Sequence, residues 1–480
     1  MAEYETVIGL EVHAELKTQS KMYCGCSNRF GAEPNTLVCP VCMGLPGALP
    51  VLNKKAVALA IKAGIAFNCQ IDLASYQDRK NYFYPDLPKS YQISQSERPL
   101  CRNGYLDVLV NGNHKRIHIN RIHIEEDAGK LVHDPDNGIT LADYNRCGVP
   151  LIEIVTEPDI NSSAEAKAFL ETVKSTLKAL DISDCKMQEG SVRCDVNVSL
   201  REQGSPILGT RCEMKNVNSF SAAVRGIEYE VSRQKDILEN GGTIIQETRR
   251  WDDSRGVSTV MRTKENAMDY RFFPEPDLGI IRLTEEYVND IRKTVPELPG
   301  EKLFRYIEKH SLNESEAIII AFDREKAELF EESLSCGGSV KTLCNFIVGE
   351  ITKYLNENNC HISDTKLSPT SLSELAGETE KGNISSSSAK KILAELITKG
   401  GKVNDIIGKM GLSQNSDPKF AEKLIKQVIA ENPRSVEEFR NGKTNALNHI
   451  IGLCMKASKG RANPAILRQT AENYINNREE

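Results

Sequence analysis

Apolar and polar residues alternate without interruption from Thr6 to Leu16, close to the start of the chain. A period of two is typical of a half-buried strand, so one face of this segment is predicted to enter the core. The other face carries an acid, an imidazole and a second acid at Glu11, His13 and Glu15. Side chains two positions apart on a strand lie about 6–7 Å apart, close enough to converge on one ion or proton. Taken alone, however, this strand favours the simpler interpretation of a solvated outer face.

The same alternation returns in three later segments, whose polar faces carry Arg121, His123 and Glu125; Arg193, Asp195 and Asn197; and Arg211, Glu213 and Lys215. Each face places acids beside Arg or His, whereas ordinary outer faces mix Thr, Lys, Glu and Gln. Carboxylates suit divalent cations and guanidinium groups suit phosphates. The four faces together predict a metal- and phosphate-binding sheet, an arrangement that serves phosphoryl transfer. The sequence has no Walker loop, so any nucleotide is expected to bind on the sheet.

The segment Lys115–Gly129 departs from strict alternation in two places. A slip of one residue at Asn120-Arg121 predicts a β-bulge. Farther on, Glu126 falls on the apolar side unless the strand ends there, and the residues that follow favour such an end. Three consecutive acids repel one another unless a cation or a base lies among them.

Four of the 14 cysteines form two close pairs, separated by residues 27–38: Cys24 with Cys26, and Cys39 with Cys42. Two such pairs, with Gly and Pro turning the chain inside them, predict the closed four-thiolate site of structural zinc. Four thiols without a metal in a loop are the alternative. Most of the other cysteines stand singly in apolar settings, which is typical of a reducing compartment.

Two segments, 78–92 and 270–277, combine aromatic, proline and charged residues. Proline excludes a long helix and stiffens a loop. The first segment places Lys80 and Lys89 among tyrosines, which would suit an anionic substrate. An ordinary surface loop would look similar.

Helical periodicity predicts helices over 53–67, 162–179 and 222–240. Asn53 is the expected cap of the first, and Ser162 or Ser163 that of the second. Beyond the proline-rich boundary at 294–300 the chain reads as helical, with Ser388 as the cap of one helix. A hinge at 408–418 opens a small tail. We therefore expect an α+β chain with a catalytic domain over 1–293, an all-helical domain over 294–407 and a tail domain over 408–480.

The composition, 40% hydrophobic and 27% charged, is that of an ordinary globular protein. The net charge is −6, so any contact with nucleic acid requires a local basic patch. The tail offers one, because Lys443–Arg468 holds five basic residues and no acid, although a solvated helical face would look similar. The sequence shows no basic and apolar leader at its start and no apolar run of bilayer length, so we expect a cytoplasmic protein.

Six longer runs are similar to those of a single family: Ile8–Leu16, Tyr82–Lys89, Arg121–Lys130, Asp143–Pro150, Met187–Asp195 and Phe273–Leu278. The chain resembles the B-subunit family of bacterial aspartyl/glutamyl-tRNA(Asn/Gln) amidotransferases, and the similarity extends to Lys456–Pro464 in the tail. Two positions depart from the family pattern, Ser90 where Gly is expected and Met268 where His is expected. Neither belongs to the acid and histidine set.

The resemblance implies an antiparallel-sheet cradle with flanking helices, followed by a helical domain and a helical tail. It implies a heterotrimer with an amidase A subunit and a small C subunit. It also implies that ATP and Mg²⁺ serve to phosphorylate the side-chain carboxylate of Glu or Asp misattached to tRNA(Gln) or tRNA(Asn). Ammonia from glutamine, released by the A subunit, then displaces the phosphate. The chain lacks the Ser/Ser/Lys amidase signature, consistent with a separate amidase subunit.

The resemblance also implies residue roles. The Mg²⁺ ligands would be Glu11, His13, Glu125, Asp195 and Glu213, with a histidine among them making Mn²⁺ an alternative ion. Glu125, Glu126 and His13 would be catalytic, while Glu126, Lys80 and Lys89 would mark the path of ammonia. Arg121 and Arg193 would bind the phosphates of ATP, and Lys456, Lys459 and Arg461 would contact the tRNA backbone.

Two other functions stay open at this point. One is a non-catalytic RNA-binding subunit, built on the cysteine pairs and the basic tail, that only presents tRNA to an enzyme. The other is a free-standing amide ligase acting on small molecules, which leaves the basic tail unexplained.

Overall fold

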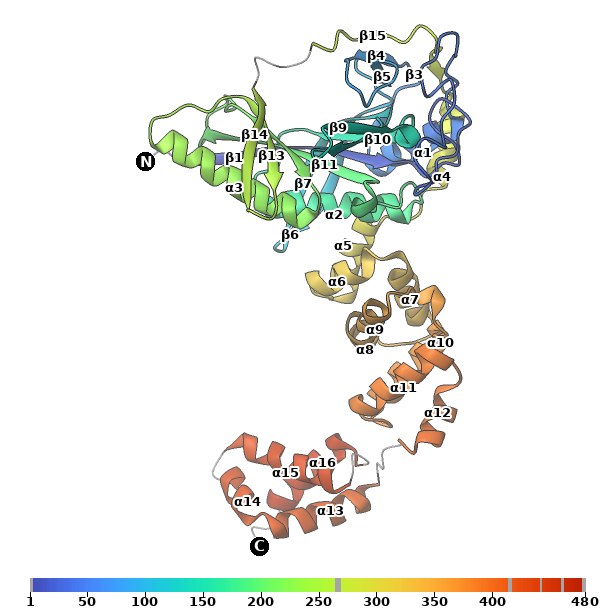
Figure 1. Ribbon diagram of the computed structural model, residues 1–480. Coiled ribbons are helices and arrows are strands. Elements are labelled where there is room, and N and C mark those ends of the chain that lie inside the picture. The colour runs from blue at the N-terminus through green and yellow to red at the C-terminus, as the bar shows by residue number, and fades with distance from the viewer. Residues whose placement is uncertain (1–2, 264–268, 413–416, 441–442, 459–461, 477–480) are drawn as a thin grey trace. The chain divides into compact units, whose positions relative to one another are not determined.

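The computed structural model describes residues 3–263, 269–412, 417–440, 443–458 and 462–476. The chain divides into two compact units, Met1–Lys302 and Leu303–Glu480 (Figure 1). The first unit combines a large sheet with helices, and the second consists of helices. The predicted α+β class followed by helical domains is confirmed.

The first unit contains all the described strands, and the longer ones form its main sheet. Their bounds are β1 (Tyr4–Glu15), β2 (Gln70–Ile71), β3 (Ala74–Ser75), β4 (Asp78–Asn81), β5 (Tyr91–Ser94), β6 (Cys101–Val110), β7 (Asn113–Glu126), β8 (Lys130–Asp134), β9 (Ile139–Asp143), β10 (Pro150–Thr156), β11 (Val192–Glu202), β12 (Cys212–Val217), β13 (Glu247–Asp252), β14 (Val257–Thr263), β15 (Phe273–Pro274) and β16 (Ile281–Arg282).

The main sheet has nine described strands in the order β14-β13-β12-β11-β1-β10-β7-β6-β2. All neighbours are antiparallel except β12 and β13, which are parallel. β1 therefore lies inside the sheet, between β10 and β11, although it begins the chain. This central place explains why its apolar face alternates so regularly, since side chains on both neighbouring strands contact it.

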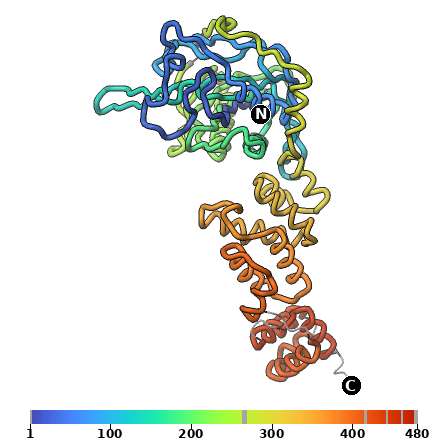
Figure 2. The backbone as a smooth tube through the Cα atoms, turned by 90° about the vertical axis from the view of Figure 1, so that its right-hand side faces the viewer, coloured from blue at the N-terminus to red at the C-terminus, as the bar shows by residue number. Residues whose placement is uncertain are grey.

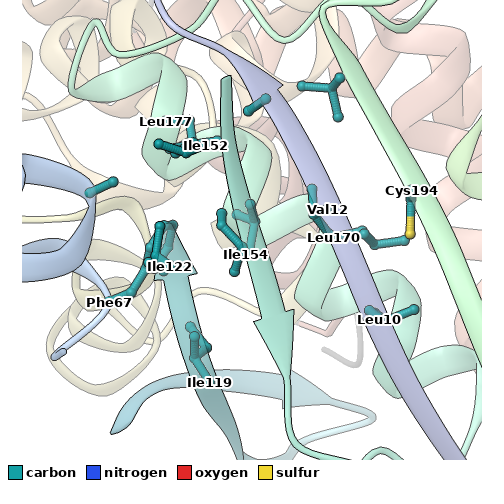
Figure 3. Packing of buried hydrophobic residues seen from close by; sticks show 14 of the residues in the cluster. Leu10, Val12, Phe67, Ile119, Ile122, Ile152, Ile154, Leu170, Leu177 and Cys194 are labelled. Atoms are coloured by element: carbon teal, nitrogen blue, oxygen red, sulfur yellow. The ribbon is translucent and has the colours of Figure 1, made fainter. Parts of the chain in front are cut away.

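The apolar face of the sheet carries the core of the first unit. Leu10 and Val12 of β1 pack beside Ile122 of β7 and Ile154 of β10, and Leu170 of helix α2 covers them (Figure 3). Helices α1 (Lys54–Ala66), α2 (Ser163–Ala179) and α3 (Phe220–Glu239) contribute to the same cluster, so the opposite, polar face is left for the site. Burying this much apolar side chain on one face fixes which residues of each strand face the other way.

Several local predictions are confirmed. Asn53 caps α1 and Ser162 caps α2, each with a side-chain oxygen that accepts backbone N–H groups. The register between β7 and β10 shifts where Val155 pairs with Arg121 and the next residue pairs with Ile119, which is the predicted bulge at Asn120.

Two short segments of the first unit pair outside the main sheet. Strand β15 lies beside β4, and β4 beside β5, so the two proline-containing segments are neighbours. The guanidinium of Arg79 holds them together through Glu275, with N···O distances of 2.6 and 2.9 Å.

The helices continue from the end of the first unit through the second. Their bounds are α4 (Glu285–Lys293), α5 (Pro299–His310), α6 (Glu314–Ala321), α7 (Arg324–Ser335), α8 (Val340–Asn345), α9 (Thr352–Asn358), α10 (Pro369–Glu380), α11 (Ser386–Lys399), α12 (Val403–Met410), α13 (Pro418–Glu431), α14 (Pro433–Arg440), α15 (Thr444–Ala457) and α16 (Pro464–Asn476). Figure 2 traces this region in yellow, orange and red. The residues from Ala421 to Ile475 form a hydrophobic cluster of their own, which supports our proposal of a separate tail domain.

One expectation needs correction. Helix α11 begins at Ser386 and is capped by Ser385, one turn before the predicted cap at Ser388. Each serine of the run 385–388 could cap the helix. Ser388 and Ala389 are buried inside the helix, which therefore begins after the first of these serines. Strand β7, in contrast, ends at Glu126 as predicted, and this last residue pairs with Pro150.

The two departures from the family pattern differ in what the structure shows. Ser90 has φ of 62°, in the left-handed region that glycine adopts freely. A serine there costs roughly 1–2 kcal/mol of backbone strain. Met268 lies outside the described residues.

Candidate functional site

The polar face of the main sheet opens into a cleft of about 730 Å³. In the register of the sheet, Glu153 of β10 lies opposite both His13 of β1 and His123 of β7. Asp195 of β11 lies opposite Glu11 of β1. Directly opposed side chains on antiparallel strands have Cβ atoms about 4.5–5.5 Å apart. Strand pairing thus brings residues from four strands into one cleft.

The first cluster in the cleft, here called the His–Glu group, consists of His13, Glu125 and Glu153. Their ligand atoms all lie within 4.8 Å of one another. Nε2 of His13 is 3.4 Å from the carboxylate of Glu125 and 3.6 Å from that of Glu153. Beside the group, Nε2 of His123 is 3.0 Å from Glu153, and the hydroxyl of Ser94 donates to Glu125 at 3.2 Å.

A raised pKa of His123 favours its protonated form, which balances part of the negative charge of Glu125 and Glu153. Burial lowers the pKa of His123, but the charge of Glu153 and the hydrogen bonds with both carboxylates outweigh it and raise that pKa to about 9. Burial raises the pKa of Glu153, yet His123 holds it well below its usual value. The group therefore offers two ionised carboxylates and one imidazole nitrogen, a donor set that fits a divalent cation.

The second cluster, here called the carboxylate trio, consists of Glu11, Asp195 and Glu213, with ligand atoms also within 4.8 Å of one another. The ammonium of Lys215 hydrogen-bonds Asp195 and lies 2.7 Å from Glu213. Burial raises the pKa of Glu11, and the charges of Glu153, Asp195 and Glu213 raise it further. Arg262 lies 3.9 Å from Glu213. Three acids facing one lysine and one more distant arginine retain excess negative charge, so this cluster also fits a divalent cation.

Both predicted phosphate-binding arginines lie in the cleft. Nη2 of Arg193 is 2.9 Å from the buried carboxylate of Asp127, which also binds Arg146. The Nε of Arg121 is buried and finds no hydrogen-bond partner among the described residues. A buried N–H without a partner is costly, and a ligand oxygen would satisfy it.

Neighbouring acids at the end of β7 face different cavities. Glu125 belongs to the cleft, whereas Glu126 lines a separate cavity of about 120 Å³. There the ammonium of Lys89 pairs with Glu126, and the backbone N–H of Ile93 donates to the same carboxylate at 3.0 Å. The residues expected along the ammonia path are thus divided, because Lys80 lines the cleft instead.

The four paired cysteines come together as the sequence suggests. The sulfur atoms of Cys24, Cys26, Cys39 and Cys42 all lie within 4.8 Å of one another. A hydrogen bond with Cys24 is the main cause that lowers the pKa of Cys42, to about 4, and the ammonium of the buried Lys21 adds to the effect. Four gathered sulfurs on two tight turns fit tetrahedral zinc.

The basic tail is described in part. Lys456 lies in the last turn of α15 and is exposed. Lys459 and Arg461 lie outside the described residues.

The cleft also contains three titratable residues that the sequence analysis did not predict as metal ligands: His123, Glu153 and Lys215. His123 and Lys215 stand on polar faces that the alternation identifies. Glu153 had a weaker signal, a single acid inside the apolar run Leu151–Val155. Only its pairing with β1 and β7 shows that this acid faces the histidines.

Comparison with known proteins identifies the family. The family model for the GatB/GatE catalytic domain matches residues 6–289, and that for the GatB domain matches residues 328–475. The B subunit of the aspartyl/glutamyl-tRNA(Asn/Gln) amidotransferase of Caldicellulosiruptor bescii is 52% identical over 470 residues, or 97% of this chain and 98% of that protein. Its namesake in Clostridium tetani is 47% identical over 475 residues, or 99% of each chain. The chain belongs to this B-subunit family.

Membership in the B-subunit family confirms the resemblance of the sequence motifs. The cleft, both ligand clusters and the four cysteines lie within the match to the family's catalytic domain, and Lys456 lies within the second match. None of the helices in the described part of the chain is both long and apolar enough to cross a bilayer.

Proposed function

We propose that this chain is the activating and amidating subunit of a glutamine-dependent amidotransferase, an ATP-dependent carbon–nitrogen ligase. Its substrates are Glu or Asp misattached to tRNA(Gln) or tRNA(Asn). A side-chain carboxylate oxygen attacks the γ-phosphorus of ATP, and ADP leaves. Ammonia then attacks the acyl carbon, phosphate leaves, and the proton that ammonia loses passes to a base. The amidase A subunit supplies the ammonia, and a small C subunit completes a cytoplasmic heterotrimer.

The observation that carries this proposal is the gathering of two potential metal-ligand clusters and two arginines in one cleft. Phosphoryl transfer needs little covalent chemistry from the protein, because positioning and charge neutralisation supply most of the catalysis. A cleft of this charge pattern suits a triphosphate next to a carboxylate substrate. The names of the relatives support the same reaction.

The His–Glu group and the carboxylate trio would hold Mg²⁺, with Mn²⁺ as an alternative because one ligand is an imidazole. Such an ion, when bound, neutralises the charge on the phosphate oxygens of ATP. Two arginines of the chain would bind the phosphates directly. Asp127 holds Arg193 in place, and the buried Nε–H of Arg121 lacks a partner among the described residues. Both guanidinium groups bind phosphate oxygens and orient the γ-phosphorus toward the substrate carboxylate.

We assign Glu126 and Lys89 to the entry of ammonia and Lys80 to its arrival in the cleft. Glu126 and Lys89 form an ion pair in the smaller cavity on the opposite face of β7 from Glu125. Lys80 lies on the cleft wall, and its charge contributes to the lowered pKa of Glu153. Ammonia would therefore pass from the smaller cavity to the cleft.

Two further roles belong to the proposal. Zinc on the four cysteines would be structural, since the set is closed and leaves no open position for a substrate. Lys456, together with Lys459 and Arg461, would contact the phosphate backbone of tRNA without reading its sequence.

Substituting Glu11→Gln or Glu125→Gln in the assembled heterotrimer tests the proposal. Amide formation on Glu-tRNA is expected to fall at least about 100-fold, because each change removes a charge that the transition state requires. Glutaminase activity of the partner subunit stays measurable. The matched control is Glu5→Gln, on the same polar face of β1 but outside the cleft, which should leave product formation unchanged.

A subunit that only presents tRNA gives the opposite expectations. In that case Glu125→Gln would retain full amidation, and nucleotide with Mg²⁺ would bind only to the partner. Protection of His13 from imidazole-modifying reagents by an ATP analogue, measured on the full chain, would exclude this alternative.

A further inference from the structure

A row of three aromatic rings lines one wall of the cleft. Tyr82, Tyr270 and Phe272 all face it, and we call them the aromatic wall. The rings of Tyr82 and Tyr270 meet edge to face with centroids 6.1 Å apart, and those of Tyr270 and Phe272 do so at 6.0 Å. Edge-to-face contact is a favoured arrangement of aromatic rings, so the three side chains form one ordered row.

Backbone pairing fixes the aromatic wall although its members are distant in sequence. The backbone N–H of Asn81 donates to the carbonyl of Tyr270 at 2.9 Å, and the side-chain amide of Asn81 donates to that of Arg271 at 2.9 Å. Next along the chain, Phe273 of β15 pairs with Arg79 of β4. Hydrogen bonds and strand pairing therefore hold together the two segments that carry the rings.

Packing within the protein does not account for these rings. Phe272 is 43% exposed, and both tyrosines are only half-buried. Aromatic side chains that serve a core are normally covered, because each buries a large apolar area. A partly open row of rings at the edge of a charged cleft is instead typical of a ligand-binding surface.

A cation completes the aromatic wall. The ammonium of Lys80 lies 4.8 Å from the ring centroid of Tyr270 and also lines the cleft. Aromatic rings with a basic side chain beside them are the usual means by which proteins hold unpaired nucleotides, since bases stack on the rings and phosphates attract the cation.

We propose that the aromatic wall is a subsite that stacks an adenine base. This inference rests on the proposed function, in which two reactants carry adenine: ATP, and the 3′-terminal adenosine whose ribose bears the amino acid. Both must place their reacting groups beside the ligand clusters of the same cleft. Stacking on Phe272 would hold the base while leaving the ester or the triphosphate free to reach those clusters.

The test measures KM for each reactant separately in the assembled complex that contains Phe272→Ala. Loss of one stacking ring is expected to raise KM about tenfold for the reactant whose base it holds, with kcat at saturation changed less than about twofold. A rise in KM for aminoacyl-tRNA assigns the subsite to the RNA end, and a rise in KM for ATP assigns it to the nucleotide. Phe272→Trp keeps a stacking face and should restore the original KM.

The matched control is Phe83→Ala. Phe83 is 85% exposed and adjoins Tyr82 in sequence, yet it does not line the cleft. Its removal tests whether any exposed aromatic ring near this loop matters, and both KM values should stay unchanged.

A binding measurement separates failure of the subsite from failure of the proposed function. tRNA ending in 2-aminopurine, and the corresponding ATP analogue, lose fluorescence when the base stacks on an aromatic ring, and neither titration requires turnover. Quenching of one probe by the wild-type complex, reduced at least threefold in Phe272→Ala, supports the subsite even if amidation fails. Equal quenching in both proteins, unchanged KM for both reactants, or full recovery with Phe272→Leu would overturn it.

Discussion

The two ligand clusters of the cleft balance their charge in different ways. In the His–Glu group, the carboxylates face His123, which is 3% exposed and fixed on a neighbouring strand. In the carboxylate trio, the nearest positive charge is Lys215, whose side chain is 33% exposed and ends a flexible stem, while Arg262 lies farther off, 3.9 Å from Glu213. A fixed buried partner becomes part of the folded structure, whereas a flexible one competes with any ion for the same oxygens. We therefore expect the first cluster to contribute to the stability of the fold and the second to bind and release ions more readily.

The largest expected effect comes from Glu153→Ala. This change leaves the buried imidazolium of His123 without its nearest partner, at 3.0 Å, and should lower the free energy of unfolding of the first unit by roughly 3–5 kcal/mol. Denaturant unfolding followed by the fluorescence of Trp251, the only tryptophan and a buried residue of β13, measures it. The matched change Glu11→Ala relieves repulsion in the trio and should not destabilise the unit. Equal losses of unfolding free energy in both variants would show that the two clusters do not differ in their contribution to stability.

A smaller effect is expected from Lys215→Met. Removing the competing ammonium should raise the affinity of the cleft for Mn²⁺ about tenfold, since a charge this close shifts ionic equilibria by a unit or more of log K. Electron paramagnetic resonance of free Mn²⁺ in a titration of the full chain provides the measurement. The control is Lys115→Met, which changes a half-buried lysine of β7 that pairs with Glu165 outside the cleft. A fall in affinity would show that Lys215 supports the ion site rather than competing with it.

The smallest effect on the cleft should follow removal of zinc. A thiol-competitive chelator is expected to release one zinc per chain and to open residues 24–42 to proteolysis, because the two cysteine turns lose their common centre. Mn²⁺ affinity of the cleft should change less than about twofold, since no sulfur of the cluster lines it. Metal analysis before and after treatment, with the same Mn²⁺ titration, checks both points. Absence of zinc in the untreated protein would contradict the assignment of the four cysteines as a structural zinc site.

Local patterns predicted much of this structure. The alternation in β1, the bulge at Asn120 and the caps at Asn53 and Ser162 depend on neighbours in sequence, and the structure confirms them. The serine run at 385–388 shows the limit of such signals, because several residues were chemically equal as caps and tertiary burial chose among them. The cysteine pairs are close in sequence, so their meeting was also foreseeable.

The division of the predicted ligands into two clusters was not foreseeable. Glu11 and His13 lie two residues apart on β1, yet Glu11 joins Asp195 and Glu213 while His13 joins Glu125 and Glu153. Which strands flank β1, and in which register, depends on contacts between segments more than a hundred residues apart. The same pairing recruited Glu153, which local pattern alone did not distinguish from a core position.

By itself the sequence predicted which acids and histidines share the polar side of each strand and to which family the chain is similar, because periodicity and motifs are local properties of a polypeptide. Tertiary structure alone decided which acids gather in one cluster, that Glu125 and Glu126 line different cavities, and that Tyr82 meets Tyr270. Those relations arise from long-range strand pairing and burial, which depend on the whole fold at once.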